Sequence, residues 1–180
     1  NGLNLILNDN VDDNMGYPNS TFFIKKAGTT SDGLAYYVIQ ASGLNSVGDG
    51  QADVCMNAYD GSVSESLMGL YDTVNNSKTK ANGTFFIKEA GKSNDLAYYV
   101  IQVSGSEEPG DEQADLCIHA LGGSVAGTNI ELYGGVDYNK GIPNGTFFIK
   151  PVENNNDDEN NNENNNENNN NDAGNICCIS

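Results

Sequence analysis

The sequence predicts an all-β fold of three tandem antiparallel units, each about 62 residues long and resembling a small β-sandwich or immunoglobulin-like module. The first observation is a repeat: Asn-Gly-Thr-Phe-Phe-Ile-Lys occurs at 82–88 and 144–150, and Asn-Ser-Thr-Phe-Phe-Ile-Lys at 19–25. The copies begin at residues 19, 82 and 144, so they are 63 and 62 residues apart. The second observation is that β-branched and aromatic residues dominate these stretches, and the third is that no sustained helical period appears.

Each unit is expected to contain four strands in a fixed order. Clusters of Gly, Ser, Asn and Asp, which form turns, separate four strand-like runs of the first unit at 21–25, 35–41, 53–59 and 67–71. The second run returns, because Leu-Ala-Tyr-Tyr-Val-Ile-Gln at 34–40 is repeated at 96–102. The third run returns as well, since Gln-Ala-Asp-Val-Cys at 51–55 becomes Gln-Ala-Asp-Leu-Cys at 113–117.

The two ends of the chain are out of phase with this unit. Leu3, Leu5 and Leu7 occur at every second position, next to polar Asn4 and Asn8. Leu7 lies 12 residues before Asn19, which is the spacing between the fourth strand of a unit and the Asn-Gly-Thr stretch that follows it. The chain therefore begins with a fourth strand that has no first to third strand before it. It ends on Asn-Ile-Cys-Cys at 175–178, which aligns with the third strand. We expect a surplus strand at the beginning and a missing strand at the end.

These features predict the domain boundaries. We expect a donor strand and loop at 1–18, complete units at 19–81 and 82–143, and an incomplete third unit at 144–180. Within the third unit, residues 153–172 are almost entirely Asn, Glu and Asp. A tract without apolar side chains cannot offset its ordering entropy by burial, so we expect a solvated loop. The alternative is an Asn-rich ladder stabilised by neighbouring copies of the chain.

The charge of the chain excludes two classes of partner. It contains 25 acidic residues against 8 basic ones, all of them Lys, and its formal net charge is -17. Nucleic acid is bound through clusters of Lys and Arg, so neither nucleic acid nor an anionic membrane surface is an expected partner. No apolar run approaches the roughly 20 residues of a membrane helix. The chain has neither an initiator Met nor a signal peptide, which indicates a mature product or an excerpt.

Repeated glycan acceptors indicate an extracellular or cell-surface protein. The acceptor pattern Asn-x-Ser/Thr occurs at Asn19, Asn75, Asn82 and Asn144. Three of these sites are at equivalent positions of the repeat, which chance does not readily produce. N-linked glycans are therefore the expected modification, and no cofactor is required.

The cysteines are candidates for cross-links. One occurs in each unit, and the last is doubled, giving Cys55, Cys117, Cys177 and Cys178. None has the C-x-x-C spacing of a zinc or thioredoxin-type site. A single cysteine cannot form a bond within its own module, so a disulfide has to join units or chains. The alternative is that each cysteine is a small buried hydrophobic side chain of the third strand.

Acidic turns before the third strand are candidate calcium sites. They contain Asp49 and Asp53 in the first unit, and Asp111 and Asp115 in the second. Calcium requires six to eight oxygen ligands, which carboxylates, Asn side chains and backbone carbonyls supply. No complete EF-hand spacing is present, so solvated turns are the favoured interpretation.

Catalytic motifs do not stand out in the sequence. His119 is the single histidine, and it belongs to no repeated motif. No nucleophile elbow accompanies it, so we expect no enzyme. The tyrosine pairs at 36–37 and 98–99 are candidates for stacking on sugar, although paired tyrosines in strands usually pack against cross-strand neighbours.

The phase of the repeat suggests a structural role. We expect a head-to-tail homopolymer in which the N-terminal strand of one chain completes the third unit of the next, with Leu3, Leu5, Leu7 and Ile176 at the contact. The product would be an extracellular, N-glycosylated filament. In the alternative, the strand completes its own molecule. The domain then resembles the closed pseudo-threefold β-trefoil and β-prism lectins, and its function is carbohydrate binding. A third interpretation is a segment of a longer array.

Overall fold

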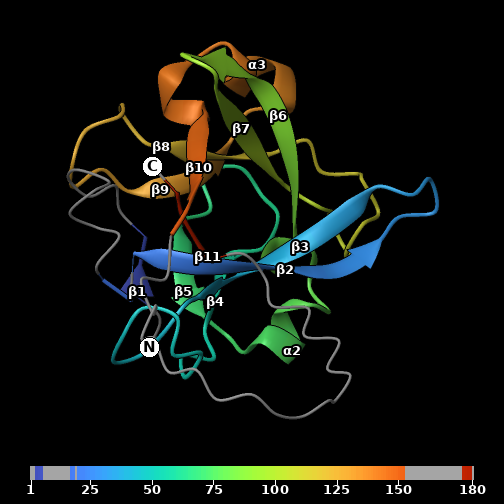
Figure 1. The fold of residues 1–180 in the computed structure, drawn as a ribbon. Coiled ribbons are helices and arrows are strands. Elements are labelled where there is room, and N and C mark those ends of the chain that lie inside the picture. Colours follow the sequence, from blue (N-terminus) through green and yellow to red (C-terminus); the bar gives the residue numbers. More distant parts are fainter. Residues whose placement is uncertain (1–2, 6–16, 19, 153–175, 180) are drawn as a thin grey trace.

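An antiparallel sheet that closes on itself forms the body of the molecule (Figure 1). The computed structural model describes residues 3–5, 17–18, 20–152 and 176–179. Their secondary structure is almost entirely β, which confirms the predicted all-β class. The strands share one sheet, because strands of one unit pair with strands of the next. They do not separate into sandwich or immunoglobulin-like modules.

The elements follow the order of the repeat. The first half of the chain contains β1 (Leu3–Asn4), β2 (Thr21–Thr29), β3 (Ala35–Ala41), β4 (Cys55–Ala58), β5 (Met68–Tyr71), the helical turn α2 (Val74–Ser77) and the 3₁₀ turn η1 (Ala81–Gly83). The second half contains β6 (Phe85–Ser93), β7 (Leu96–Val103), β8 (Cys117–Ala120), β9 (Ile130–Tyr133), α3 (Val136–Lys140), η2 (Pro143–Gly145), β10 (Phe147–Pro151) and β11 (Ile176–Ile179).

Three hairpins, β2–β3, β6–β7 and β10–β11, form a ring of strands. Pairing of β3 with β6, of β7 with β10, and of β11 with β2 closes the ring. The first two hairpins have the same register, because Phe22 lies opposite Ala41 and Phe85 lies opposite Val103. Both also contain a register shift next to a glycine. The repeat in the sequence is thus a repeat of hairpin geometry.

The N-terminal strand joins the shorter hairpins β4–β5 and β8–β9. Leu3 of β1 lies opposite Leu70 of β5. The Leu5 N–H donates to the Met68 carbonyl at 2.9 Å, and the Leu5 carbonyl accepts from the Ile130 N–H at 3.1 Å. Three copies of the fourth strand, β1, β5 and β9, therefore meet within one chain. The N-terminal strand is thus used within its own chain, but its described contacts are with the first two units and not with the third.

The two ends of the chain differ from the sequence-based expectation. β1 pairs with β5 of its own chain, and donation of this strand to a neighbouring chain stays a prediction. The C-terminal segment occupies the position of a second strand and not of a third, because β11 pairs with β10 and with β2. The alignment with the third strand is therefore wrong: the ring needs a partner for β10, and the last apolar segment supplies it. Leu7 and the Asn-rich tract at 153–172 lie outside the described residues.

Equivalent side chains form the core. Phe22, Phe85 and Phe147 begin the three hairpins and are 5%, 0% and 4% exposed. Ile39 and Ile101, from the second strands, belong to the same buried cluster. Burial of each such side chain stabilises the fold by about 2–3 kcal/mol relative to exposure. The first phenylalanine of each Thr-Phe-Phe stretch thus faces the core. The second lies on the opposite face of the strand, where Phe23 and Phe148 are partly exposed and Phe86 is buried.

The Asn-Gly-Thr stretch has a packing role at the entry to each hairpin. A Cβ atom on Gly83 would overlap the Asn57 side-chain oxygen, and one on Gly145 would overlap the Asn139 side-chain oxygen. In the second unit the following threonine, Thr84, is also buried, and its hydroxyl lies 2.6 Å from the Ser104 hydroxyl. Glycine and threonine are therefore required here by close packing, independently of any glycan.

A glycine-to-alanine pair tests this packing. We expect Gly145→Ala to lower the free energy of unfolding by about 1–3 kcal/mol, because the new methyl group displaces the buried Asn139 amide. Gly141→Ala is the matched control: its φ of -88° suits alanine, and the nearest atom to a Cβ there is the Tyr138 carbonyl oxygen at 3.6 Å. The control should be neutral or stabilising by less than about 1 kcal/mol in urea unfolding. Equal losses in both variants would contradict the packing role.

Candidate functional site

A pocket of about 380 Å³ lies where η2 and the β10 strand meet β7 and β8. Its wall includes three aromatic rings, one side-chain amide and several hydroxyl groups, from Ser93, Tyr98, Ser124, Asn144, Thr146, Phe147 and Phe148. The Tyr98 and Phe148 rings meet edge to face, with centroids 6.1 Å apart and planes at 80°. Such an apolar, concave surface with a few polar groups is typical of a small-molecule site. We call it the Tyr98 pocket.

The aromatic wall depends on a glycine in the neighbouring strand. Gly91 of β6 lies opposite Tyr98 of β7. A Cβ on Gly91 would overlap the Tyr98 phenol, so the ring lies directly across the glycine. The first hairpin has the same pair in Gly28 and Tyr36. This packing holds the Tyr98 ring across the strands and presents it to the pocket.

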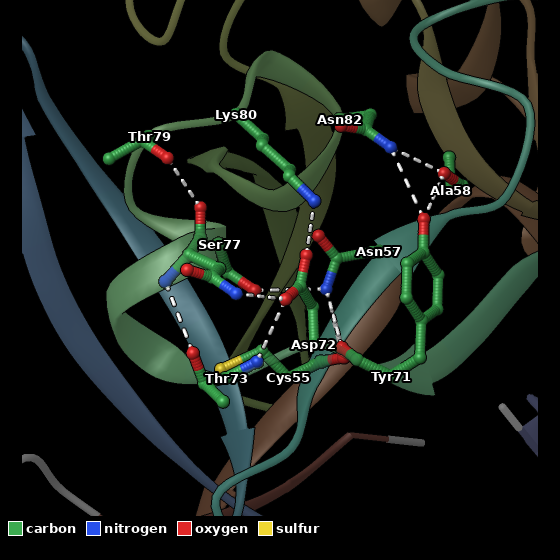
Figure 2. A network of polar contacts seen from close by, with 11 residues as sticks. Cys55, Asn57, Ala58, Tyr71, Asp72, Thr73, Ser77, Thr79, Lys80 and Asn82 are labelled. Carbon is green, nitrogen blue, oxygen red and sulfur yellow. Dashed lines mark hydrogen bonds and ion pairs between the residues drawn. The ribbon is translucent and has the colours of Figure 1, made fainter. Parts of the chain in front are cut away.

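Asn144 brings an amide to the pocket from η2. Its Nδ2 donates to the Ala120 carbonyl at 3.0 Å and to His119 Nε2 at 2.9 Å. The first unit has the equivalent contact, because Asn82 Nδ2 donates to the Ala58 carbonyl and, at 3.3 Å, to the Tyr71 hydroxyl (Figure 2). In both units the asparagine of Asn-Gly-Thr thus fastens η1 or η2 to the end of a third strand.

The two asparagines that make these contacts, Asn82 and Asn144, are also predicted glycan acceptors. A glycan would be attached through Nδ2, and in Asn82 and Asn144 this atom makes hydrogen bonds within the fold. Asn75 is exposed in α2, and Asn19 lies outside the described residues. Glycosylation stays a prediction. The recurrence of Asn-Gly-Thr is also explained by the packing and hydrogen bonds of these residues.

A polar network ties α2 to the β4–β5 hairpin (Figure 2). Asn57 Nδ2 donates to the Cys55 carbonyl at 3.1 Å, the Tyr71 carbonyl at 2.9 Å and the Ser77 hydroxyl at 3.0 Å. Lys80 forms an ion pair with Asp72 at the edge of the network. Because Asn57 is fully buried, these bonds fix how the helical turn sits on the hairpin. The network is a structural link.

Two of the cysteines predicted to form cross-links are free thiols in the core. Cys55 and Cys117 are both 0% exposed and form no disulfide. Desolvation raises the pKa of the Cys55 thiol to about 11 and that of Cys117 to about 12. A protonated, buried thiol is inert. These two residues therefore behave as small hydrophobic side chains. Cys177 and Cys178 contribute backbone to β11, and their side chains lie outside what is described.

Two of the candidate calcium ligands organise loops, and calcium binding stays a prediction. The Asp49 carboxylate accepts hydrogen bonds from backbone N–H groups, contributed by Leu44, Asn45, Ser46 and Gln51. The Asp111 carboxylate does the same in the second unit, with Ser106, Glu107, Glu108 and Gln113. The N–H groups, with that of Gln51 first, hold the pKa of Asp49 well below its ordinary value.

The other two predicted calcium ligands cap helical turns. Asp53 Oδ1 accepts from the Val74 N–H, and Asp115 Oδ1 accepts from the Val136 N–H, both at 2.9 Å. These N–H groups lie at the starts of α2 and α3, which lack intrahelical acceptors. In the part of the chain that the structure describes, no group of three or more His, Cys, Asp or Glu side chains is arranged to hold a metal ion. The four carboxylates thus have backbone partners.

Comparison with protein-family models, with curated proteins and with solved structures found no match to this chain. None of the helices in the described ranges has the length and apolar character to cross a membrane. Sequence reasoning identified Tyr98 as a residue able to stack on sugar but missed the pocket around it. Ser93 ends β6 and Ser124 lies in a bend, and no periodic pattern marks either residue.

The Asp111 loop predicts a specific dependence of stability on pH. Desolvation acts to raise the pKa of Asp111, but the N–H groups of Gln113, Glu108 and Glu107 outweigh it and hold the pKa at about 2. A lowered folded-state pKa gives stability that is complete above the ordinary value of 3.8 and is lost as pH falls through about 2. Asp111→Asn should therefore cost about 1 kcal/mol at neutral pH and weaken the pH dependence in this window.

Urea unfolding between about pH 2 and pH 7 measures this effect. The matched control is Asp95→Asn in the exposed turn of the β6–β7 hairpin, where the φ of 63° is accepted by asparagine. This control should retain the pH profile of the unchanged chain. Identical profiles for Asp111→Asn and the unchanged chain would contradict the role of the loop.

Proposed function

We propose that this protein is a carbohydrate-binding module that holds a neutral sugar in the Tyr98 pocket. The observation that carries the proposal is the wall of the pocket, where the Tyr98 and Phe148 rings lie beside amide and hydroxyl groups. A sugar ring has the same two-sided chemistry. Its C–H groups form an apolar face that packs on an aromatic ring, and its hydroxyl groups require hydrogen-bond partners.

The size of the pocket and the net charge of the chain limit the class of ligand. A volume of about 380 Å³ is near the lower end of the range for ligand pockets, roughly 300–1,000 Å³. This suits one or two sugar units. The net charge of -17 disfavours acidic sugars through long-range repulsion. A neutral sugar with several hydroxyl donors is therefore the favoured ligand.

Binding without hydrolysis suits the residues in the wall. Glycoside hydrolysis generally uses two carboxyl groups on either side of the scissile bond. The described residues that line the Tyr98 pocket include neither Asp nor Glu. The pocket is thus better suited to recognition than to acid–base chemistry.

Tyrosine variants in equivalent hairpins test the proposal. Tyr98→Ala should weaken binding of neutral sugars about tenfold, because it removes an aromatic wall worth about 1 kcal/mol or more. Tyr36→Ala is the matched control, since Tyr36 packs on Phe86 as Tyr98 packs on Phe148 but does not line the pocket. Affinity is measured by NMR titration with glucose, galactose, mannose and N-acetylglucosamine. Absence of binding, or equal losses in both variants, would overturn the proposal.

Head-to-tail assembly into an extracellular, N-glycosylated filament is a second proposal. Its specific support is the small contact of β1, which among the described residues consists of Leu3 and Asn4 paired with β5 and of Leu5 bonded to Met68 and Ile130. The same contacts can be made by β1 from a neighbouring copy, as in domain swapping. An exchange of this kind conserves the hydrogen bonds of Leu5 to Met68 and Ile130. Assembly by strand donation then needs no additional interface.

Removal of residues 1–8 tests the assembly. If chains exchange β1, sedimentation velocity should detect polymers of the complete chain but only monomers of the truncated chain, with circular dichroism unchanged. A peptide with the sequence of residues 1–8 is the control, because it fills the site on β5 without linking two chains. Adding it should dissolve existing polymers. A complete chain that stays monomeric at every concentration would contradict strand donation.

A further inference from the structure

His119 is a buried histidine placed beneath the Tyr98 pocket. It lies in β8, is 6% exposed, and is the single histidine of the chain. Its two ring nitrogens each contact a side-chain amide: Nδ1 lies 2.9 Å from Asn139 Oδ1, and Nε2 lies 2.9 Å from Asn144 Nδ2. Asn144 lines the pocket, so His119 links the pocket to the interior.

The tautomer of His119 follows from the contacts of Asn139. The Asn139 Nδ2 group donates to three backbone carbonyls, those of Tyr133 at 2.7 Å, Gly134 at 3.1 Å and Gly135 at 3.0 Å. The other amide atom, Oδ1, is therefore the one that faces His119. Because an amide oxygen only accepts, the proton of the neutral imidazole lies on Nδ1.

The same reasoning fixes the orientation of Asn144. With its proton on Nδ1, His119 offers Nε2 as an acceptor, and Asn144 Nδ2 donates to it. The Asn144 Nδ2 group also donates to the Ala120 carbonyl at 3.0 Å. Both amide hydrogens are thus used inside the fold, which leaves Oδ1 as the polar atom available to a ligand. Because Oδ1 only accepts hydrogen bonds, the ligand has to supply a donor, such as a sugar hydroxyl.

We propose that neutral His119 is a positioning residue that holds the Asn144 carbonyl oxygen toward the Tyr98 pocket, and that protonation of His119 weakens binding of hydroxyl-bearing ligands. This inference rests on the proposed function of that pocket. Protonation adds a hydrogen at Nε2, so that two donors, Nε2–H and Asn144 Nδ2, face each other. The contact recovers only if the amide turns, which presents Nδ2 to the ligand in place of Oδ1.

The groups that face His119 come from β9, α3 and η2. From β9, Glu131 lies opposite His119 in the sheet register and is 4% exposed. Burial raises the pKa of Glu131, and the interaction with His119 opposes this. From β9 and α3, the Tyr133 and Tyr138 rings lie 5.3 Å and 6.4 Å from the imidazole. Asn139 and Asn144 are uncharged. Glu131 is therefore the one facing group among the described neighbours that supplies opposite charge.

The first unit provides a version of this site that does not titrate. Asn57 occupies the position of His119, and Ser77 the position of Asn139. Asn57 Nδ2 donates to the Tyr71 carbonyl, as Asn139 Nδ2 donates to the Tyr133 carbonyl. The double variant His119→Asn/Asn139→Ser therefore copies a side-chain combination that this fold already accommodates.

The first experiment is NMR on the ligand-free chain labelled with ¹⁵N. Because the chain has a single histidine, its ring resonances need no assignment by mutation. At about pH 7.5 we expect a protonated Nδ1 and an unprotonated Nε2. On acidification, the Asn144 side-chain amide resonances should shift with the midpoint of His119. A proton on Nε2 at neutral pH, or an Asn144 amide that does not respond to the titration, overturns the inference even if no sugar binds.

The second experiment is titration of the full chain with galactose and with N-acetylglucosamine at about pH 7.5 and about pH 5. We expect the affinity to fall about tenfold or more at the lower pH, with the midpoint of the His119 titration. The double variant should bind with the same affinity at both values. An affinity of the unchanged chain that does not depend on pH overturns the inference and leaves the proposed function standing. Absence of binding at neutral pH overturns the proposed function, and the NMR result then decides on Asn144 alone.

Discussion

Closure of the ring of hairpins is the constraint on which the rest of the structure depends. Phe22, Phe85 and Phe147 are buried together only because β11 pairs with both β10 and β2. An open sheet would expose these side chains and a row of unpaired backbone groups. Closure also removes two edges of the sheet, which explains why the last apolar segment of the chain is used as a second strand. The position of the Tyr98 pocket, on the β7–β10 pair, follows from this closure.

A buried side-chain amide that packs against the glycine of Asn-Gly-Thr recurs in the first two units. In the first unit this amide belongs to Asn57 in β4, and in the second unit to Asn139 in α3. In each unit the amide contacts the side chain at the other of these two positions, which is Ser77 for Asn57 and His119 for Asn139. A polar atom buried without a partner costs about 1–3 kcal/mol. In the second unit His119 supplies a partner for Asn139 Oδ1, whereas in the first unit the buried Asn57 Oδ1 has none. The histidine thus satisfies an amide oxygen that the first unit leaves unpaired, although it belongs to no repeated motif.

The sequence indicated the strands well but not how they are connected in space. The expected strand at 35–41 is β3, and those at 21–25 and 67–71 lie in β2 and at β5. These runs are defined by local alternation, which depends on nearby residues. The pairing of β11 with β2 depends on residues more than a hundred positions apart, and the four-residue Ile-Cys-Cys-Ile segment fits a second or a third strand equally well. Asn144 posed a different difficulty, since Asn-x-Thr is both a glycan acceptor and a packing motif.

Two hairpins carry the same pair of aromatic rings, but the loops around the two pairs differ. Tyr36 and Phe86 meet edge to face, with centroids 6.4 Å apart, much as Tyr98 and Phe148 do. A Cβ on Gly110 would overlap the Tyr36 ring, so the loop that Asp111 organises lies directly on this tyrosine. Glycine at position 110 permits this close approach, and its φ of 78° also favours glycine. The first ring pair is thereby filled by the chain itself, whereas the Tyr98 ring borders a pocket. The repeated hairpin explains why aromatic rings lie at both positions, and the loop explains why one of them is covered.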